Sequence, residues 1–243
     1  MIIDAHNHVG GPDKGDHQKQ SPEEIIASMD KAGIDKSVIF AFNEINPGVS
    51  FSLANDYIAA AMKRYPDRLV GFCRLDPNHG EKAIFELERS INKLGLRGVK
   101  LHPSSQNFSL DDPTVLRIIK KASELEVPIV FDNGKPLSPP EKIGNLAELV
   151  PEAKIIMAHM RGPKYLEVAE KHDNIYLGTT GMFKIYKLQE AIQTLGAEKL
   201  IAGSDSPYTP QELEIKKIDY IPGITRKEKV KILGQNIIKI LKI

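Results

Sequence analysis

The octapeptide IIDAHNHV, residues Ile2–Val9, has the alternation from which the architecture of this chain can be inferred. Its polar residues Asp4, His6 and His8 fall on one parity. The other parity holds Ile3, Ala5 and Val9. A period of two predicts a β-strand, because successive side chains of a strand point to opposite faces. The segment is therefore interpreted as a strand with one apolar face and one face able to bind or react.

Seven further short runs rich in Val, Ile and Leu follow, and an amphipathic stretch of helical period comes after each of them. The eight predicted strands are Ile2–Val9, Lys36–Phe42, Leu69–Asp76, Leu96–His102, Pro128–Asp132, Lys154–Met160, Ile175–Thr179 and Leu200–Asp205. Eight strands alternating with helices in 243 residues favour an α/β fold of the (β/α)8 TIM-barrel type over an open doubly wound sheet, which normally has fewer parallel strands. No Gly-x-Gly-x-x-Gly follows the first run, so a dinucleotide-binding fold would lack its phosphate loop. We predict a single barrel domain over residues 1–243 that ends in a C-terminal helix.

Composition argues against several classes of protein. Hydrophobic residues make up 41% of the chain, which suffices for a core, and the single cysteine, Cys73, excludes an intrachain disulfide scaffold. The formal net charge is +1 and no block of like charges occurs, which argues against nucleic acid or an anionic membrane as a partner. No apolar run reaches the roughly 18–20 residues of a transmembrane helix. We expect a cytoplasmic protein that acts on a small molecule.

Five of the predicted strands have polar side chains near their carboxyl ends. Besides those of the first strand, these are Lys100 and His102, Asp132, His159 and Asp205. Both faces of a barrel strand are covered, so the apolar parity should face the helices and the polar parity the lumen. On this basis His159 shares the lumen face with Met157 of its strand. Active sites of TIM barrels lie at the carboxyl ends of the strands, where all these side chains would meet.

Two imidazoles that are two residues apart on a strand can converge on one cation, because their Cα atoms lie roughly 6.5–7 Å apart on one face. His6 and His8 form such a pair. Closing the barrel makes the eighth strand the neighbour of the first, which brings Asp205 beside them. Asp132 and His159 could supply a further ligand or an acid or base group. We predict a site for one divalent metal ion, with zinc as the first choice for these donors.

Two arginines are predicted to bind substrate. Arg74 on the third strand is a candidate anchor for a substrate carboxylate, because a guanidinium group matches a carboxylate with two hydrogen bonds. The alternative for Arg74 is an ion pair with Asp76 or a neighbouring loop. Arg161 follows His159 closely, at the start of a predicted helix, and is a second candidate of the same chemistry.

Other side chains near the predicted mouth have two interpretations each. Lys100 is expected to bind substrate, unless it is a carbamylated ligand that bridges two ions or a lumen lysine paired with Asp4 or Asp132. His102 either binds substrate or merely ends its strand. Asp132 could instead form an Asx turn with the Asn-Gly pair that follows it. The alternative for His159 is a core histidine bonded to a loop carbonyl.

Four of these segments occur together in a known family. They read Ile3-Asp4-Ala5-His6-Asn7-His8, Gly98-Val99-Lys100-Leu101-His102-Pro103, Ala158-His159 and Gly203-Ser204-Asp205-Ser206-Pro207. In this order they resemble the strand-end motifs of the amidohydrolase superfamily. Within it the chain is most similar to the amidohydrolase-related group, on the aminocarboxymuconate-semialdehyde-decarboxylase-like branch. The resemblance spans the whole chain and implies a metal-dependent TIM-barrel enzyme.

The fifth strand departs from the pattern of that group. Where the resemblance implies a histidine ligand, in the context Pro-x-x-x-His-x-Gly, the segment that starts at Pro128 places Asp132. A carboxylate also binds a divalent ion, at about 2.0–2.2 Å. The site then either keeps Asp132 as a ligand, uses His159 instead, or has lost tight binding.

The resemblance admits two reactions. We expect foremost a metal-dependent hydrolase of a small amide, ester or lactone, in which Asp205 takes a proton from a metal-activated water and His159 stabilises the oxyanion. The alternative is a nonoxidative, metal-dependent decarboxylase of an aromatic or enoic acid. A third hypothesis is a catalytically inactive barrel that acts as a binding module. Specificity would come from the loops Gly10–Gln20, Asn43–Ser50 and Ser104–Leu110, and a homodimer is a possible assembly.

Overall fold

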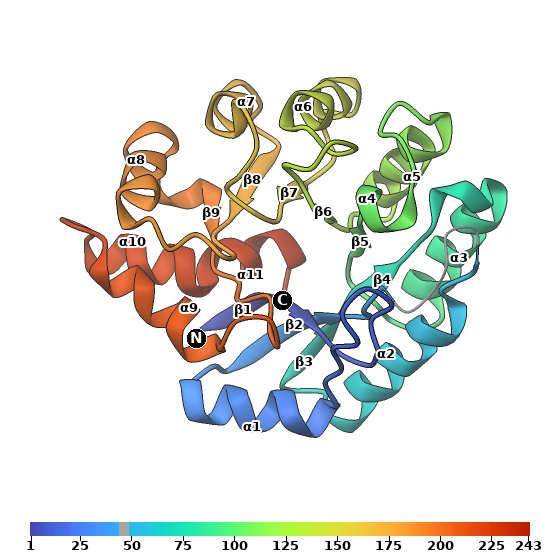
Figure 1. The fold of residues 1–243 in the computed structure, drawn as a ribbon, viewed down its shortest axis with the longest axis horizontal. Coiled ribbons are helices and arrows are strands. Elements are labelled where there is room, and N and C mark those ends of the chain that lie inside the picture. The colour runs from blue at the N-terminus through green and yellow to red at the C-terminus, as the bar shows by residue number, and fades with distance from the viewer. Residues whose placement is uncertain (44–48) are drawn as a thin grey trace.

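The computed structural model describes residues 1–43 and 49–243, and it shows parallel strands surrounded by helices (Figure 1). The strands are β1 (Ile3–His8), β2 (Lys36–Phe40), β3 (Leu69–Gly71), β4 (Cys73–Arg74), β5 (Val99–Leu101), β6 (Ile129–Phe131), β7 (Ile155–Met157), β8 (Ile175–Gly178) and β9 (Leu200–Ile201). They pair in the orders β1-β2-β3 and β4-β5-β6-β7-β8-β9, always parallel. The predicted α/β barrel is confirmed. Of the predicted loop Asn43–Ser50, residues 44–48 lie outside the described residues.

The two sheets join into one ring. On the third predicted strand, the Phe72 N–H donates to the Ile39 carbonyl (2.8 Å), whereas the next residue, Cys73, donates to the Gly98 carbonyl (2.9 Å). This switch of partner divides that strand into β3 and β4. At the other junction the His8 N–H donates to the Ser206 carbonyl (2.8 Å), so the segment after β9 closes the ring against β1.

The helices follow the strands along the chain. They are α1 (Pro22–Ala32), α2 (Ser52–Arg64), α3 (Glu81–Asn92), α4 (Pro103–Gln106), α5 (Pro113–Glu124), α6 (Pro140–Leu149), α7 (Tyr165–Lys171), α8 (Ile185–Leu195), α9 (Gln211–Lys216), α10 (Arg226–Val230) and α11 (Asn236–Leu241). Local sequence sets their ends: α1 begins with a capping box between Ser21 and Glu24 and stops at Gly33, whose φ of 69° favours glycine. No helix within the described ranges has the length and apolar character needed to cross a membrane.

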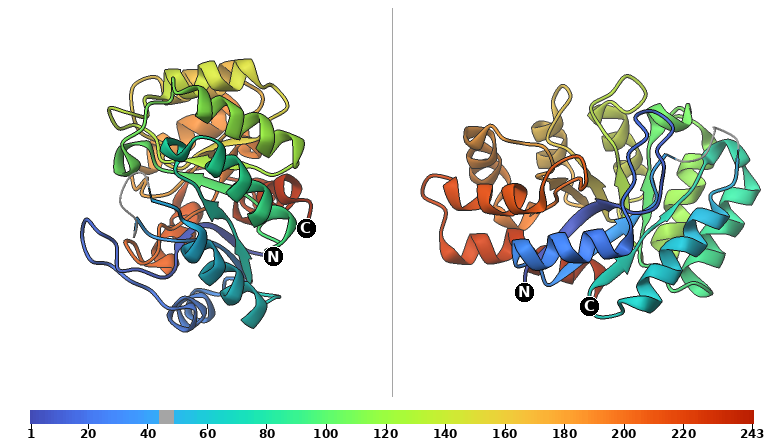
Figure 2. Two further views of the ribbon diagram at one scale, coloured as in Figure 1. Left: turned by 90° about the vertical axis from the view of Figure 1, so that its right-hand side faces the viewer. Right: turned by 60° about the horizontal axis from the view of Figure 1, so that its bottom comes forward.

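An apolar inner layer fills the lumen and leaves one end open for polar residues. It contains Val38, Phe40, Val70, Phe72, Val130, Ile156 and Ile201. Ile237 and Ile240 of α11 belong to the same cluster, and Lys154, just before β7, donates to the Ile240 carbonyl. The C-terminal helix therefore covers the amino ends of the strands, the end at which both termini lie (Figure 2). The opposite end, where the strands finish, is left for the site.

The first strand differs from the predicted alternation. Its pairing with β2 shifts between Asp4 and Asn7, so Ala5 and His6 together stand opposite the single residue Val38. This β-bulge reverses the parity. Ile3 and Ala5 join the inner layer, and Asp4 points outwards. The prediction that Asp4 faces the lumen is wrong, whereas His6 and His8, beyond the bulge, turn inwards.

The sixth predicted strand also changes parity at its end. β7 stops at Met157, which packs in the outer apolar layer, while Ile156 and Ala158 belong to the inner one. The chain bends over Ala158–Met160, and this bend brings His159 to the lumen side. The prediction that His159 and Met157 share a face is therefore wrong, although His159 does reach the lumen.

Candidate active site

A buried polar network outside the ring fixes the end of β1. Asp4 accepts hydrogen bonds from the N–H groups of Ser204 (2.9 Å) and His6 (3.2 Å), and Gln211 of α9 donates to its second oxygen (2.9 Å). Burial raises the pKa of the Asp4 carboxyl. Because Asp4 is engaged on the outer side, the predicted pairing of Lys100 with Asp4 is wrong.

His6, His8 and Asp205 come together at the mouth. Asp205 Oδ1 lies 3.3 Å from Nε2 of His6 and 3.2 Å from Nε2 of His8, and the ligand atoms of all three lie within 4.8 Å of one another. Donors that stand about 2.0–2.2 Å from a common ion are themselves about 3 Å apart, so this spacing fits a divalent cation. The predicted set of two strand-one histidines and the strand-eight aspartate is thus brought together.

The electrostatics of this group suit a metal ligand set. Burial, reinforced by the nearby Lys100 charge, lowers the pKa of His6 to about 3, and burial also lowers the pKa of His8. Burial alone would raise the pKa of Asp205, but its hydrogen bonds with the two histidines hold that pKa well below its usual range. At neutral pH the group therefore offers two neutral imidazoles and one carboxylate, the forms that bind metal ions.

The backbone around Asp205 is shaped for this contact. Asp205 has a left-handed φ of 69°, and its N–H donates to the His6 carbonyl (2.8 Å). Two residues earlier, a Cβ at Gly203 would lie 2.9 Å from the His6 Cβ and 2.7 Å from the Thr180 Oγ1. The absence of a side chain at Gly203 lets the segment after β9 approach β1 closely enough to bring the carboxylate to the imidazoles.

Asp132 lies in a different group. Its Oδ2 is 3.3 Å from Nε2 of His159 and 3.4 Å from Nε2 of His102, and it is also contacted by Lys135 (3.2 Å) and Arg161 (3.3 Å). Burial would raise its pKa, but His159 and the nearby positive charges hold it well below the usual range. These contacts, rather than an Asx turn, engage the carboxylate. Among the described residues, the cluster with metal-ligand spacing does not include Asp132 or His159.

The orientation of His159 is set by backbone contacts. Its Nδ1 lies 3.2 Å from the Thr180 carbonyl, which only accepts hydrogen bonds, so Nδ1 holds a hydrogen. Its own N–H donates to the Asn133 side chain (2.9 Å). His159 is thus bonded to a loop carbonyl, which was one of the two predicted interpretations of this residue. Nε2 of the same ring faces the Asp132 carboxylate. Because an unprotonated Nε2 and a carboxylate oxygen are both acceptors, a proton or a metal ion would be needed between them.

Lys100 and His102 lie between these two groups. Lys100 is buried, its Nζ lies 3.2 Å from Nε2 of His6, and burial lowers its pKa to about 7. His102 accepts a hydrogen bond from the Ser105 N–H at Nδ1 (3.1 Å), which leaves Nε2 to face Asp132 and Lys135. Burial lowers the pKa of His102 to about 2. The structure brings both side chains to the predicted mouth, and their roles stay predictions.

Arg74 does not reach the cavity. Its guanidinium is fully buried and donates to the Ala41 carbonyl (3.2 Å) and to the side chains of Asn43 (2.5 Å) and Gln106 (3.2 Å). Gln106 in turn accepts from the His102 N–H (3.0 Å). The placement of Arg74 thus favours a role in holding Asn43 and His102 rather than direct contact with a substrate carboxylate.

A cavity of about 260 Å³ opens over these groups. Its lining residues are His8, Asp13, Asp16, Asn43, Lys100, His102, Asp132, Lys135, Arg161, Asp205 and Tyr208. Sequence analysis singled out none of Asp13, Asp16, Asn43, Lys135 and Tyr208, although the first three lie in the loops Gly10–Gln20 and Asn43–Ser50 that it expected to set specificity. All five lie in loops after strands, where no periodic pattern marks a functional side chain. The sequence signal was their position in a segment that follows a predicted strand, a position that many residues without a function share.

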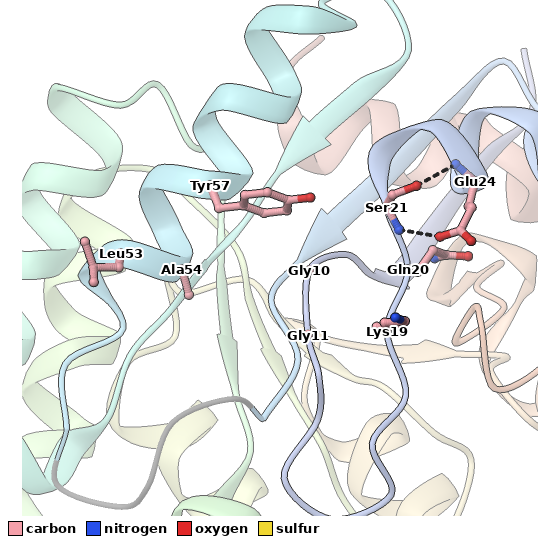
Figure 3. A pocket seen from close by; sticks show the side chains of 9 residues that line it. All are labelled: Gly10, Gly11, Lys19, Gln20, Ser21, Glu24, Leu53, Ala54 and Tyr57. Atoms are coloured by element: carbon pink, nitrogen blue, oxygen red, sulfur yellow. Dashed lines mark hydrogen bonds between the residues drawn. The ribbon is translucent and has the colours of Figure 1, made fainter.

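A larger hollow of about 720 Å³ lies beside the mouth, between the loop that precedes α1 and the start of α2 (Figure 3). Gln20, Ser21 and Glu24 line one side, with Leu53 and Tyr57 on the other. The polar groups here have local partners, since Ser21 and Glu24 bond each other and Gln20 bonds the His8 carbonyl and the Ser206 hydroxyl. The smaller cavity, which holds the convergent titratable groups, is the better candidate for an active site.

A family model named Amidohydrolase matches residues 3–243. The chain belongs to this family. Among curated proteins, gamma-resorcylate decarboxylase of Polaromonas sp. strain JS666 is 24% identical over 64% of this chain and 65% of its own length. The 2-amino-3-carboxymuconate-6-semialdehyde decarboxylase of Dictyostelium discoideum is 25% identical over 77% of this chain and 65% of its own length. The chain thus spans about 65% of the length of these relatives.

A solved structure adds a comparison of the fold. The dihydroxybenzoic acid decarboxylase from Polaromonas sp. JS666, solved with manganese and the inhibitor 2-nitroresorcinol, superimposes with a TM-score of 0.75 at 18% identity, covering 99% of this chain and 96% of that one. These named relatives are decarboxylases, so the expectation of a hydrolase as the foremost function is wrong and the alternative is favoured. That structure contains manganese, so it does not favour zinc over other divalent ions.

Proposed function

We propose that this member of the Amidohydrolase family is a nonoxidative, metal-dependent decarboxylase of a small aromatic or enoic acid. The observation that supports it most directly is one cavity that combines a divalent-cation site with three basic side chains, Lys100, Lys135 and Arg161. Cations at a mouth of this kind attract a carboxylate. The decarboxylase relatives support the same reaction, and a cavity of about 260 Å³ suits a single-ring acid.

The reaction requires little more than binding and one proton. The bond between carbon and the carboxylate breaks, carbon dioxide leaves, and a proton takes its place on the carbon. His159 is the proposed proton donor, because its Nδ1 hydrogen is engaged by the Thr180 carbonyl and Nε2 is left to exchange a proton. Lys135 and Arg161, whose side chains are partly exposed, would bind the anionic substrate. No activation of water is needed, so Asp205 is assigned to the metal site alone.

A divalent ion held by His6, His8 and Asp205 would neutralise the substrate carboxylate and withdraw electron density from the atoms around it. Two imidazoles favour zinc, while additional oxygen donors favour manganese. Zinc stays our first candidate, and both ions belong in the test. The fit of the site rests on the 3.2–3.3 Å spacing of its donor atoms and on their unprotonated state at neutral pH.

The test uses the protein loaded with zinc or with manganese, incubated with 2,6-dihydroxybenzoate and a panel of aromatic and enoic acids. We expect release of carbon dioxide and, in D₂O, one deuterium on the carbon that lost the carboxylate. His159→Gln should lower turnover by about 10²–10⁴-fold. His172→Gln, at the end of α7 and away from the cavity, is the control and should match wild type. Incorporation of oxygen from H₂¹⁸O without carbon dioxide release would refute the proposal.

A further inference from the structure

A buried ion pair on the segment after β9 has no part in the chemistry proposed above. Glu214 of α9 is fully buried and Lys217, at the start of the 3₁₀ turn Lys217–Tyr220, is 5% exposed. The Lys217 ammonium contacts the Glu214 carboxylate directly. Burying two charges is costly, and a pair of apolar side chains of similar volume is often at least as stable. Stability alone therefore does not account for these two residues.

Both residues of the pair hold the short segment that follows β8. The Gly181 N–H donates to Glu214 Oε1 (3.1 Å), and Lys217 Nζ donates to the Thr179 carbonyl (2.6 Å). Thr180 lies between these two anchored residues. Its carbonyl is the acceptor for Nδ1 of His159. The ion pair therefore holds the residues on both sides of Thr180, whose carbonyl orients the proposed proton donor, His159.

We propose that Glu214 and Lys217 are positioning residues that fix the tautomer of His159 through the Thr180 carbonyl. A neutral imidazole holds one hydrogen, and a carbonyl facing Nδ1 keeps it there. Nε2, which faces Asp132, is then the atom left to take up a proton and deliver it to the substrate. If the Thr179–Gly181 segment moved, the ring would be free to place its hydrogen on Nε2 and donate it to Asp132.

An ion pair suits this task because each partner makes a directional contact. Glu214 uses one oxygen for Lys217 and the other for the Gly181 N–H, while Lys217 divides its hydrogens between Glu214 and the Thr179 carbonyl. Apolar residues would fill the same volume without fixing the peptide planes. The residues Gln211, Glu214 and Lys217 form a stripe at helical spacing, and all three are buried. Gln211 bonds Asp4 of β1, while Glu214 and Lys217 bond the segment that follows β8.

The catalytic role of this ion pair rests on the proposed function, whereas its effect on the His159 tautomer can be tested without any activity. The variant is Glu214→Met/Lys217→Met, which removes both charges and both directional contacts while keeping similar volume. The matched control is Glu212→Met/Lys216→Met, which makes the same changes to a more exposed pair on the same helix (2.7 Å). The tautomer of His159 is read from side-chain ¹⁵N NMR, assigned with His159→Gln, in protein treated with a chelator so that no ion holds Nε2.

We expect wild type and control to have hydrogen on Nδ1 of His159, and the double variant to have a mixture of tautomers. In metal-loaded protein we expect kcat to fall by about tenfold or more with KM nearly unchanged. A single Nδ1–H tautomer in the folded double variant, or an equal change in the control, would overturn the proposal. If the double variant does not fold, Glu214→Asp replaces it, because the shorter side chain withdraws the acceptor from the Gly181 N–H. The same NMR readout and the same outcomes then apply. A wild type without decarboxylase activity would refute the proposed function, and the NMR result would still decide this inference.

Discussion

The close approach of the segment after β9 to β1 makes Gly203→Ala a sharp probe of the candidate metal site. The added Cβ would lie 2.9 Å from the His6 Cβ and 2.7 Å from the Thr180 Oγ1. Non-bonded carbons prefer about 3.5–4.0 Å, so the methyl group and His6 must separate by roughly 0.6–1.1 Å. The spacing of 3.3 Å between the His6 and Asp205 donor atoms is then lost. A displacement of more than about 0.5 Å is enough to disrupt a preorganised site.

Two quantities follow for this variant. Inserting a methyl group into a packed region costs about 1–3 kcal/mol, equivalent to a fall in Tm of roughly 2–12 °C for a chain of this size. Zinc affinity should fall by about 10–100-fold, the usual effect of disturbing the support of a ligand. The assays are calorimetric unfolding and competition with a chromophoric chelator.

Gly33→Ala is the matched control. Gly33 has a φ of 69° and no atom within 4 Å of the built Cβ, so alanine there is strained without a clash and far from the mouth. A left-handed alanine costs about 1–2 kcal/mol, which makes the two variants comparable in stability. We expect only Gly203→Ala to lose zinc affinity. If both variants lose stability but bind zinc as wild type does, His6 is not a ligand held by this contact and the argument fails.

Three further predictions concern the same mouth. His6→Ala/His8→Ala should abolish metal retention in a folded barrel, as elemental analysis and circular dichroism would show; retained metal would place the site elsewhere. Asp132→Asn should reduce zinc affinity less than Asp205→Asn does in the same chelator competition, because two basic side chains already contact Asp132; the reverse order would make Asp132 a principal ligand. Arg74→Lys should lower turnover by about tenfold at unchanged metal content, since an ammonium cannot replace the three contacts of the guanidinium, and wild-type kcat and KM would contradict this.

The sequence predicted the barrel because its repeat is long-range and redundant. Eight apolar runs separated by amphipathic stretches leave few alternatives, and an error in one run does not alter the fold class. Individual faces were less predictable. The bulge at Ala5 and His6 adds one residue to β1 and exchanges the faces of Ile3 and Asp4, yet nothing in the local composition distinguishes a bulged strand from a regular one.

The candidate site was likewise predictable only in part. His6, His8 and Asp205 could be grouped from sequence because spacing and barrel closure bring them together. Lys135 and Tyr208 could not, because their positions depend on loop conformations that short-range patterns do not encode. Arg74 was assigned to substrate from its chemistry, but its burial and bonds to neighbouring amide groups are properties of the packed structure.

Two of the carboxylates at the mouth, Asp132 and Asp205, are each contacted by two imidazoles. What separates them is the surrounding charge. Asp205 contacts His6 and His8, both held neutral, so these three residues have a net charge of about −1. Lys100 lies beside His6, but its pKa of about 7 means that it adds only part of a positive charge at neutral pH. Asp132 is also contacted by Lys135 and Arg161, and two positive charges against one negative charge leave about +1. A divalent cation is attracted to the first group and repelled by the second, while an anionic substrate is attracted to both the bound cation and the second group. The substrate would therefore lie across the cavity between them, beside His159, which is where a proton must be delivered when the carboxylate departs.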